Sequence, residues 1–148
     1  MRIDYVSVNK ELVWLQDHFV YHITEKNNMD NIMRYGLLPS LGDRSILAGD
    51  NFKAVFFFDK LYNLDNWINF LYQCRDKASL EVLRFNIKQI RCFSHNDGEE
   101  FYTKQIIPVE KIDYLEISKK DCSLIDFNDL SNQDVDYRWR KLKEYHKN

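Results

Sequence analysis

The stretch 19–39 constrains the fold of this chain more than any other segment. A short apolar run at 19–24 (FVYHIT) predicts a strand that carries one histidine, His22. Residues 28–35 then predict a short helix, because Met29, Ile32 and Met33 make a one-sided apolar stripe and Asn27 or Asn28 can cap it. Gly36 suits the left-handed position after the last turn, and Pro39 prevents the helix from continuing.

Segments before and after this unit predict the remaining elements. Residues 8–19 read as a helix, with Ser7 as its N-cap and Val8, Leu12, Leu15 and Phe19 near one face. Residues 40–52 are polar and predict a loop, and the continuous apolar run 53–58 (KAVFFF) predicts a buried strand. A helix is expected from Asn63 or Asp65, with its apolar face formed by Leu64, Trp67, Ile68, Leu71 and Tyr72.

The second half of the chain reads mainly as strands. We expect strands at 80–87, 100–107 and 112–117, the last two on either side of Pro108, and a turn at 94–100. From about residue 132 the tail predicts a helix on which Val135, Trp139 and Leu142 share a face.

This order is not the regular alternation of strands and helices that a Rossmann domain requires, and no GxGxxG motif is present. It predicts an α+β fold built on a mainly antiparallel sheet. A length of 148 residues without an internal repeat or a Pro/Gly/Ser linker favours one domain over 1–148.

Composition excludes several classes of function. The net charge of −2 gives no general attraction to nucleic acid or to an anionic membrane, and no apolar run could span a bilayer. Cys74, Cys92 and Cys122 form no CxxC motif, so we expect reduced thiols in the cytoplasm. The four histidines are scattered and none has zinc-ligand spacing to a cysteine, which argues against a metal site.

The strand at 19–24 supplies the first candidate site residues. A histidine in an apolar strand is more often a core residue than a functional one, but the ring of His22 can donate one hydrogen bond and accept another, which suits a ribose hydroxyl. Thr24 shares its face, because side chains alternate along a strand. The backbone of Ile23 lies between them and has a donor and an acceptor to offer an amide.

Further candidates lie on two predicted strands and one loop. Glu99 and Glu100 read either as a solvated acidic turn or as one cleft-facing and one solvent-facing carboxylate, since neighbours on a strand point to opposite faces. If Glu100 faces a cleft, Tyr102 and Lys104 share its side. One ring among 56–58 can line a pocket, and Arg44 can hold a phosphate.

The basic tail, RWRKLKEYHK at 138–147, reads in two ways. It can form a nucleic-acid patch, since it interleaves basic and aromatic residues. The plainer interpretation is an amphipathic helix with basic residues near its C-terminal end.

Three segments in order resemble the motifs of the ADP-ribosyltransferase superfamily. VYHITEKNNMDNIMRYGLLP resembles the opening strand with His-x-Thr/Ser, a short helix and Gly-Leu; AVFFFDKL resembles the second, aromatic strand; and EEFYTKQIIPVEKI resembles the third, in which a glutamate begins a strand that leads to Ile-Pro. The resemblance covers roughly 19–117. In character it is closest to small bacterial and phage members such as the DarT-like DNA ADP-ribosyltransferases.

The resemblance implies an ADP-ribosyltransferase-like split sheet with flanking helices, and NAD as co-substrate. His22 would hold a ribose of NAD with support from Thr24, Ile23 would hold the nicotinamide amide, and Phe56 would stack on nicotinamide. Glu100 would be catalytic, and Arg44 would belong to the NAD-binding residues. The partner would be a macromolecular acceptor, protein or nucleic acid, and no membrane; if the chain is a toxin, an antitoxin or inhibitor would be a further partner.

Two departures from the family pattern keep alternatives open. Gly98 stands where many protein-modifying members have Glu or Gln, and Phe56 replaces the usual tyrosine. The alternatives are a non-catalytic nucleotide- or nucleic-acid-binding module on the same fold, and an NAD glycohydrolase. RNA 2′-phosphotransferase chemistry is a weaker alternative, because Arg44 is the only obvious phosphate ligand.

Overall fold

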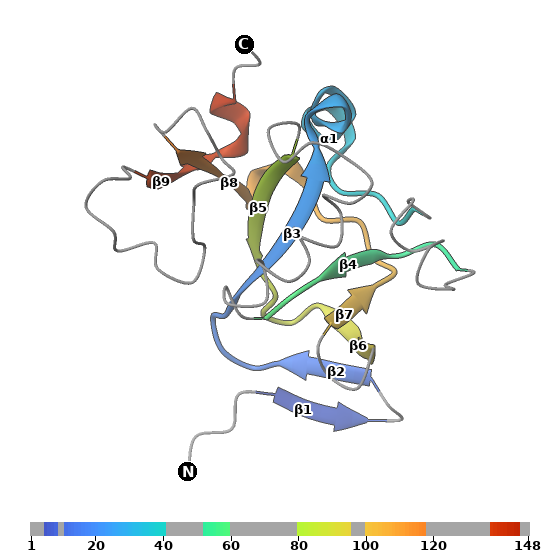
Figure 1. The fold of residues 1–148 in the computed structure, drawn as a ribbon. Helices are drawn as coiled ribbons and strands as arrows, with labels where there is room; N and C mark the ends of the chain where they lie inside the picture. The colour runs from blue at the N-terminus through green and yellow to red at the C-terminus, as the bar shows by residue number, and fades with distance from the viewer. Residues whose placement is uncertain are drawn as a thin grey trace.

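The computed structural model describes residues 5–8, 11–40, 52–59, 80–95, 100–117 and 137–145. The described part contains two antiparallel sheets and one α-helix (Figure 1). None of its helices is long and apolar enough to cross a membrane.

The first sheet has the strand order β1-β2-β6-β7-β4. Its strands are β1 (Tyr5–Val8), β2 (Glu11–Trp14), β6 (Arg91–His95), β7 (Glu100–Thr103) and β4 (Val55–Phe57). The second sheet has the order β3-β5-β8-β9 and is formed by β3 (Phe19–Glu25), β5 (Leu80–Asn86), β8 (Ile112–Ile117) and β9 (Tyr137–Lys141). Every pairing within both sheets is antiparallel, which confirms the predicted mainly antiparallel architecture.

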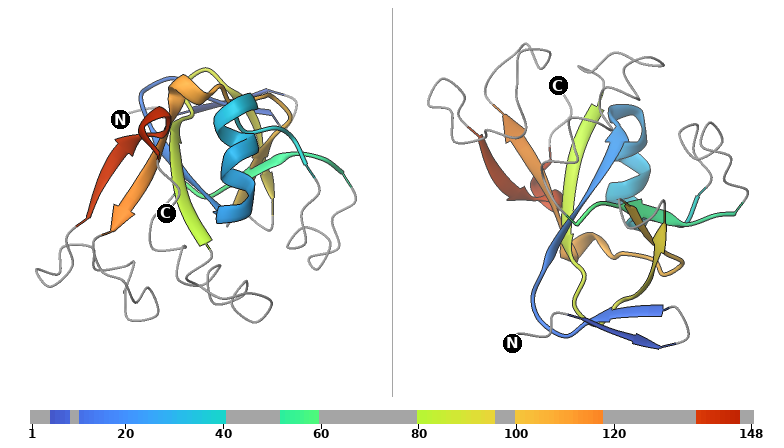
Figure 2. Two further views of the ribbon diagram at one scale, coloured as in Figure 1. Left: turned by 90° about the horizontal axis from the view of Figure 1, so that it is seen from above. Right: turned by 60° about the horizontal axis from the view of Figure 1, so that its bottom comes forward.

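The two sheets are joined where β3 passes β4. Tyr21 N donates to Phe58 O at 2.7 Å and Phe58 N donates to Tyr21 O at 2.8 Å. Strands β3 and β4 lie side by side at this point and diverge from it, and α1 (Met29–Tyr35) follows the far end of β3 (Figures 1 and 2). This junction brings residues of both sheets to one place.

Apolar side chains from both sheets and from the helix form a single core. Phe57, Phe85 and Met29 are fully buried in it, and α1 adds Ile32. Phe57 packs edge-on against Phe85 with ring centroids 5.5 Å apart and stacks on Phe101 at 6.0 Å. The apolar stripe predicted for 28–35 is therefore the buried face of the observed helix.

Gly36 ends this helix with a positive φ of 81°, but its ψ of −171° lies outside the left-handed helical region expected from the sequence. Its amide still donates to Ile32 O at 2.7 Å. A Cβ at this position would collide with the carbonyl oxygen of Ile107, so the close approach of the two chain segments requires glycine.

The helix predicted for 8–19 is wrong, because Val8 is the last residue of β1, Glu11–Trp14 form β2 and Phe19 begins β3. Two residues of the supposed apolar stripe, Leu15 and Phe19, are 46% and 42% exposed, whereas Trp14 is 3% exposed. Leu12 and Trp14 point inward with a period of two. Pairing of β2 with both β1 and β6 satisfies its backbone groups on both sides.

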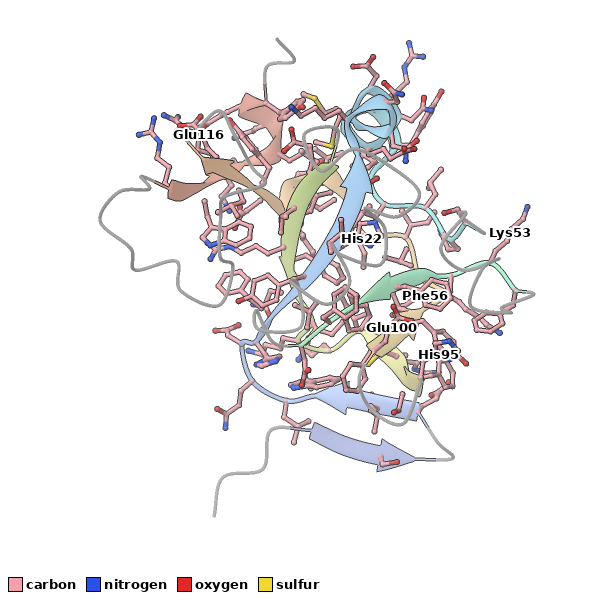
Figure 3. All side chains as sticks on the ribbon, in the orientation of Figure 1. His22, Lys53, Phe56, His95, Glu100 and Glu116 are labelled. Atoms are coloured by element: carbon pink, nitrogen blue, oxygen red, sulfur yellow. The ribbon has the colours of Figure 1, made fainter. Side chains whose placement is uncertain are left out.

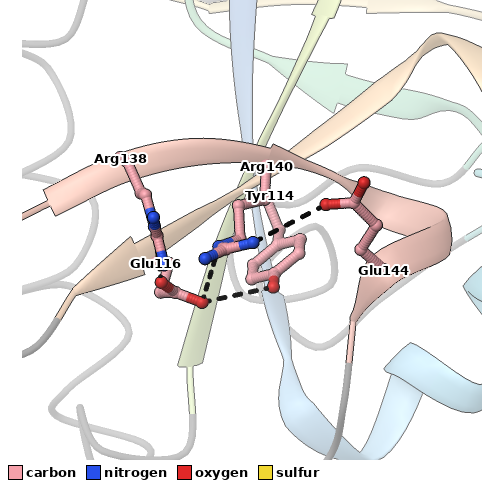
Figure 4. A network of polar contacts seen from close by, with 5 residues as sticks. All are labelled: Tyr114, Glu116, Arg138, Arg140 and Glu144. Carbon is pink, nitrogen blue, oxygen red and sulfur yellow. Dashed lines mark hydrogen bonds and ion pairs between the residues drawn. The ribbon is translucent and has the colours of Figure 1, made fainter.

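The helix predicted for the tail is also wrong where the tail is described, since 137–141 is strand β9 and a 3-10 turn, Leu142–Glu144, follows. Arg138 and Arg140 lie on one face of β9, and both reach Glu116, at 2.8 and 3.0 Å (Figure 4). Trp139 lies on the other face, 5.8 Å from the Tyr21 ring. The tail arginines therefore pair with a strand carboxylate and do not lie at a helix end.

The remaining element predictions divide into three groups. The strands at 19–24, 80–87 and 112–117 and the helix at 28–35 are confirmed to within one residue at each end, whereas the strand at 53–58 is confirmed over 55–57 and the strand at 100–107 over 100–103. Ser94 and His95, expected in a turn, belong to strand β6. Most of the loop at 40–52, the helix at 63–72 and residues 96–99 lie outside the described residues.

Candidate functional site

Three of the sequence-predicted site residues come together at the junction of the sheets. His22 comes from β3, Phe56 from β4 and Glu100 from the first position of β7. Figure 3 shows these three side chains close to one another, with His95 beside Glu100. Strands that are distant in sequence thus bring an imidazole, an aromatic ring and a carboxylate to one site.

His22 is fixed by a hydrogen bond between its ring and the neighbouring strand. Its Nδ1 lies 2.6 Å from the carbonyl oxygen of Phe56. Because a carbonyl only accepts, Nδ1 is the donor, and in a neutral ring Nε2 is then the acceptor. The structure therefore fixes both the orientation of His22 and the tautomer of its neutral form.

The backbone N–H and C=O of Ile23 point away from β5, its neighbour in the second sheet. Tyr21 and Phe58 exchange both of their backbone hydrogen bonds, so the backbone groups of Tyr21 point away from β5. Ile23 lies two residues further along β3 and pairs with Val82 on β5, so its N–H and C=O point to the same outer side as those of Tyr21. The donor and acceptor expected at Ile23 are thus directed to the side on which β3 and β4 diverge.

Thr24 lies on the same face as His22 and is 8% exposed. Its hydroxyl oxygen accepts a hydrogen bond from Asn28 Nδ2 at 3.2 Å. Asn28 is the N-cap residue of α1, at one of the two predicted positions, but its side chain makes no capping hydrogen bond to the helix and holds Thr24 instead. This contact fixes the end of β3 against the start of the helix.

Glu100 is the most unusual side chain of the site, because it is 0% exposed. A glutamate is almost never fully buried unless another group balances it. It faces His95 directly across the β6–β7 pair, and Glu100 Oε1 lies 3.9 Å from His95 Nε2. This separation is too long for a direct hydrogen bond but short enough for an ion pair with a protonated imidazole.

Side chains on β7 alternate between the two faces of the first sheet, as predicted for the residues next to Glu100. Phe101 packs on Phe57 and Trp14 in the core. Tyr102 lies on the opposite face, where it stacks on Phe93 with ring centroids 5.1 Å apart. Glu100 and Tyr102 thus share one face of the first sheet, with His95 beside them.

The ring of Phe56 forms one wall of this face. It lies 5.7 Å from Phe52, 5.6 Å from His95 and 5.8 Å from Tyr102, measured between centroids. Phe57, the next residue, points into the core, as alternation predicts. Because of its neighbours, Phe56 is only 7% exposed.

His95 and Phe52 lie at the site but are not among the residues predicted from the sequence. His95 was assigned to a turn, and 91–95 (RCFSH) has two adjacent apolar residues and no clean alternation, so no local pattern placed His95 on the face of Phe93 in β6. Phe52 precedes the predicted strand, and no local pattern indicates that its ring packs on Phe56 and Tyr102.

Two candidates, Arg44 and Glu99, lie outside the described residues, as does Gly98. Within the described ranges, no group of three or more His, Cys, Asp and Glu side chains could hold a metal ion. Comparison of the chain with family models, curated proteins and solved structures found no match.

Proposed function

We propose that this protein is an NAD-dependent mono-ADP-ribosyltransferase that modifies a macromolecule, protein or nucleic acid, and releases nicotinamide. The proposed fold is the split, mainly antiparallel sheet of that superfamily. One observation carries the proposal: His22, Phe56 and Glu100, the three motif residues to which the resemblance assigns the principal roles, lie together at the junction of the two sheets.

The proposed contacts to NAD follow from the orientation of each group. Nε2 of a neutral His22 accepts a hydrogen bond from a ribose hydroxyl, because Nδ1 is committed to Phe56 O. The outward N–H and C=O of Ile23 bind the nicotinamide amide, and Thr24 supports the same ribose region. Arg44 binds a phosphate of NAD in this proposal.

The proposed chemistry breaks the bond between the ribose C1 and the nicotinamide nitrogen. Both bonding electrons leave with nicotinamide, which becomes neutral, and positive charge builds on the ribose. The ionised carboxylate of Glu100 stabilises this oxocarbenium-like transition state, and its buried position strengthens the interaction by excluding water. The acceptor then bonds to C1 and loses its proton to solvent.

A second candidate is a non-catalytic nucleotide-binding module, which a specific observation favours. The ring of Phe56 is 7% exposed and is covered by Phe52 and His95, so it presents little surface on which nicotinamide could stack. An NAD glycohydrolase is a close relative of the leading proposal, with water as the acceptor.

Labelling with biotin-NAD tests the proposal. Wild-type protein is incubated with a lysate, with purified single-stranded DNA and with RNA, and is compared with Glu100→Gln. We expect Glu100→Gln to lose labelling by at least ~100-fold, as when an electrostatic stabiliser of a transition state is removed. Calorimetry with NAD and a nicotinamide-release assay run in parallel.

The matched control is Glu116→Gln, a partly exposed strand glutamate of the second sheet that lies away from the site (Figure 3). It should keep full labelling. Binding of NAD without Glu100-dependent turnover would favour the module, and release of nicotinamide without labelling of any acceptor would favour the glycohydrolase. Absence of both NAD binding and NAD consumption would refute the proposal.

A further inference from the structure

The outer face of the first sheet carries aromatic rings that have no role in the function proposed above. On β7, Phe101 and Thr103 face the core and are 8% and 0% exposed. Tyr102 lies between them and therefore points to the outer face, where it is partly exposed. Phe93 lies directly opposite Tyr102 on β6 and is also partly exposed. These rings thus contact both each other and water.

Phe93 and Tyr102 form an aromatic strip together with Phe52, which precedes β4. Phe93 stacks on Tyr102 with ring centroids 5.1 Å apart and an interplanar angle of 21°. The Tyr102 ring lies 4.8 Å from that of Phe52, which is partly exposed as well. Contacts between these rings stabilise the sheet, but they leave apolar ring surface in contact with water. A further flat ring can cover that surface by stacking on it.

Two cations flank the aromatic strip. Arg91 precedes Phe93 by two residues on β6, so alternation places it on the same outer face, and its side chain is 71% exposed. Lys104 follows Tyr102 by two residues, and its Nζ lies 6.0 Å from the centroid of the Phe52 ring. The carboxylate of Glu11 lies 3.9 Å from Arg91. An exposed ion pair of this length contributes little, so the Arg91 guanidinium remains accessible to a second anion.

We propose that this outer face binds single-stranded nucleic acid, with bases stacked on the aromatic strip and phosphates beside Arg91 and Lys104. Every base presents a flat face to an aromatic ring, and the backbone carries the negative charge that the two cations attract. The bases of a duplex are already stacked on one another. An acidic peptide would satisfy the cations but would leave the rings uncovered.

This binding rests on the rings and the cations alone and does not require NAD. Glu100 precedes Tyr102 by two residues on β7, so the strip ends next to the carboxylate of the proposed transferase. The net charge of the chain is −2, so the attraction is local to this face. We therefore expect a weak, salt-dependent complex, with a Kd of roughly 10–100 μM at physiological salt.

Fluorescence anisotropy of a labelled single strand tests the proposal on the full chain without NAD. The probes are dT and rU oligonucleotides of about 12 nucleotides, and the comparison strand is an abasic oligonucleotide of the same length. The abasic strand keeps the phosphates but has no bases, so it should bind at least ~10-fold more weakly. With two phosphate contacts, the slope of log K against log salt should be about −1.4.

Variants separate stacking from charge. Tyr102→Leu and Phe93→Leu should each weaken binding of the dT strand roughly tenfold, whereas Tyr102→Phe should bind normally because it keeps the ring. Lys104→Ala should make the salt slope shallower by about 0.7. The matched control is Lys143→Ala, an exposed cation of the basic tail that follows β9 in the second sheet, and it should change neither quantity. If the leucine variants do not fold, the comparison of dT with the abasic strand on the wild-type protein decides the question.

Three results would overturn the proposal. The first is a wild-type protein that binds no single strand, or that binds the abasic strand as tightly as dT. The second is a loss of binding in Lys143→Ala alone, which would place the site on the basic tail. The third is a dimer that Tyr102→Leu dissociates, because a second copy of the chain would then cover the strip. Each of these leaves the transferase proposal standing with a protein acceptor, and a protein that binds dT but not NAD would retain this site while the proposed function fails.

Discussion

Replacing Gly36 with alanine should destabilise the protein strongly, although the residue lies outside the candidate site. Its φ of 81° and ψ of −171° fall in a region that is essentially restricted to glycine. A Cβ would collide with the carbonyl oxygen of Ile107 and would lie 3.3 Å from Pro108 Cα. That carbonyl accepts from Leu37 N at 2.9 Å, and Ile107 N donates back to Leu37 O at 3.0 Å, so the collision strikes a pair of backbone hydrogen bonds.

The magnitude follows from three contributions. Backbone strain costs about 2 kcal/mol for a non-glycine residue in this region. Moving the Ile107 carbonyl weakens two backbone hydrogen bonds, each worth about 1 kcal/mol. Alanine also lowers the conformational entropy of the unfolded chain, which stabilises the folded state by about 0.7 kcal/mol. The expected loss in the free energy of unfolding is therefore about 3 kcal/mol.

Urea unfolding followed by circular dichroism measures this loss. With an m value of about 1.5 kcal/mol/M, the midpoint should fall by about 2 M while m stays constant. Leu38→Ala is the control, since this neighbouring side chain is 45% exposed and its removal should cost well under ~1 kcal/mol. A loss below ~1 kcal/mol for Gly36→Ala would show that the chain relaxes around the Cβ and would refute the steric reasoning.

Three further predictions concern the core, the pH dependence of stability and the buried thiol. Phe57→Ala should lower the free energy of unfolding by about 3–5 kcal/mol, because the ring is fully buried against Phe85 and Phe101; chemical denaturation checks this, and a cost under ~1.5 kcal/mol would contradict the packing. Burial raises the pKa of the Glu81 carboxyl above its ordinary value, although the hydrogen bond from Tyr145 opposes the rise. The contribution of Glu81 to stability is therefore complete below its pKa in the unfolded chain. It is lost as pH rises through its pKa in the folded protein. Glu81→Gln should therefore gain in melting temperature relative to wild type between about pH 4 and 7, and a constant difference would refute the linkage. Burial raises the pKa of Cys92 to about 12, so at pH 8 iodoacetamide should label this thiol, identified by peptide mass, only after unfolding; rapid labelling of the native protein would show that it is accessible.

Local chemistry was sufficient to predict most strands and the helix. Phe56, Phe57 and their neighbours form a continuous apolar run, which has no favourable place other than a buried strand. Met29 and Ile32 have helical spacing, and Gly36 and Pro39 limit the helix whatever surrounds it. These signals lie within a few residues of one another, so they can be recognised in the sequence before the partner segments are known.

The two wrong helices show where local signals fail. Residues 8–19 and the tail each contain apolar residues at spacings that a helix or a strand could use. The structure resolves the ambiguity through pairing: β2 gains hydrogen bonds from β1 and β6, and β9 gains them from β8 together with the contacts of Arg138 and Arg140 to Glu116. The paired strands are far apart in sequence, so a stretch of a few residues does not contain the contacts that favour a strand over a helix.

The candidate site divides in the same way. The sequence was sufficient to indicate which residues could form the site, because His22 supplies an imidazole and Glu100 a carboxylate, each on a predicted strand. The contacts between distant strands determine that His22 bonds to Phe56, 34 residues away, that Glu100 is buried, and that His95 lies opposite Glu100. Burial and charge pairing depend on which strands become neighbours, and that is settled by long-range sheet pairing and core packing.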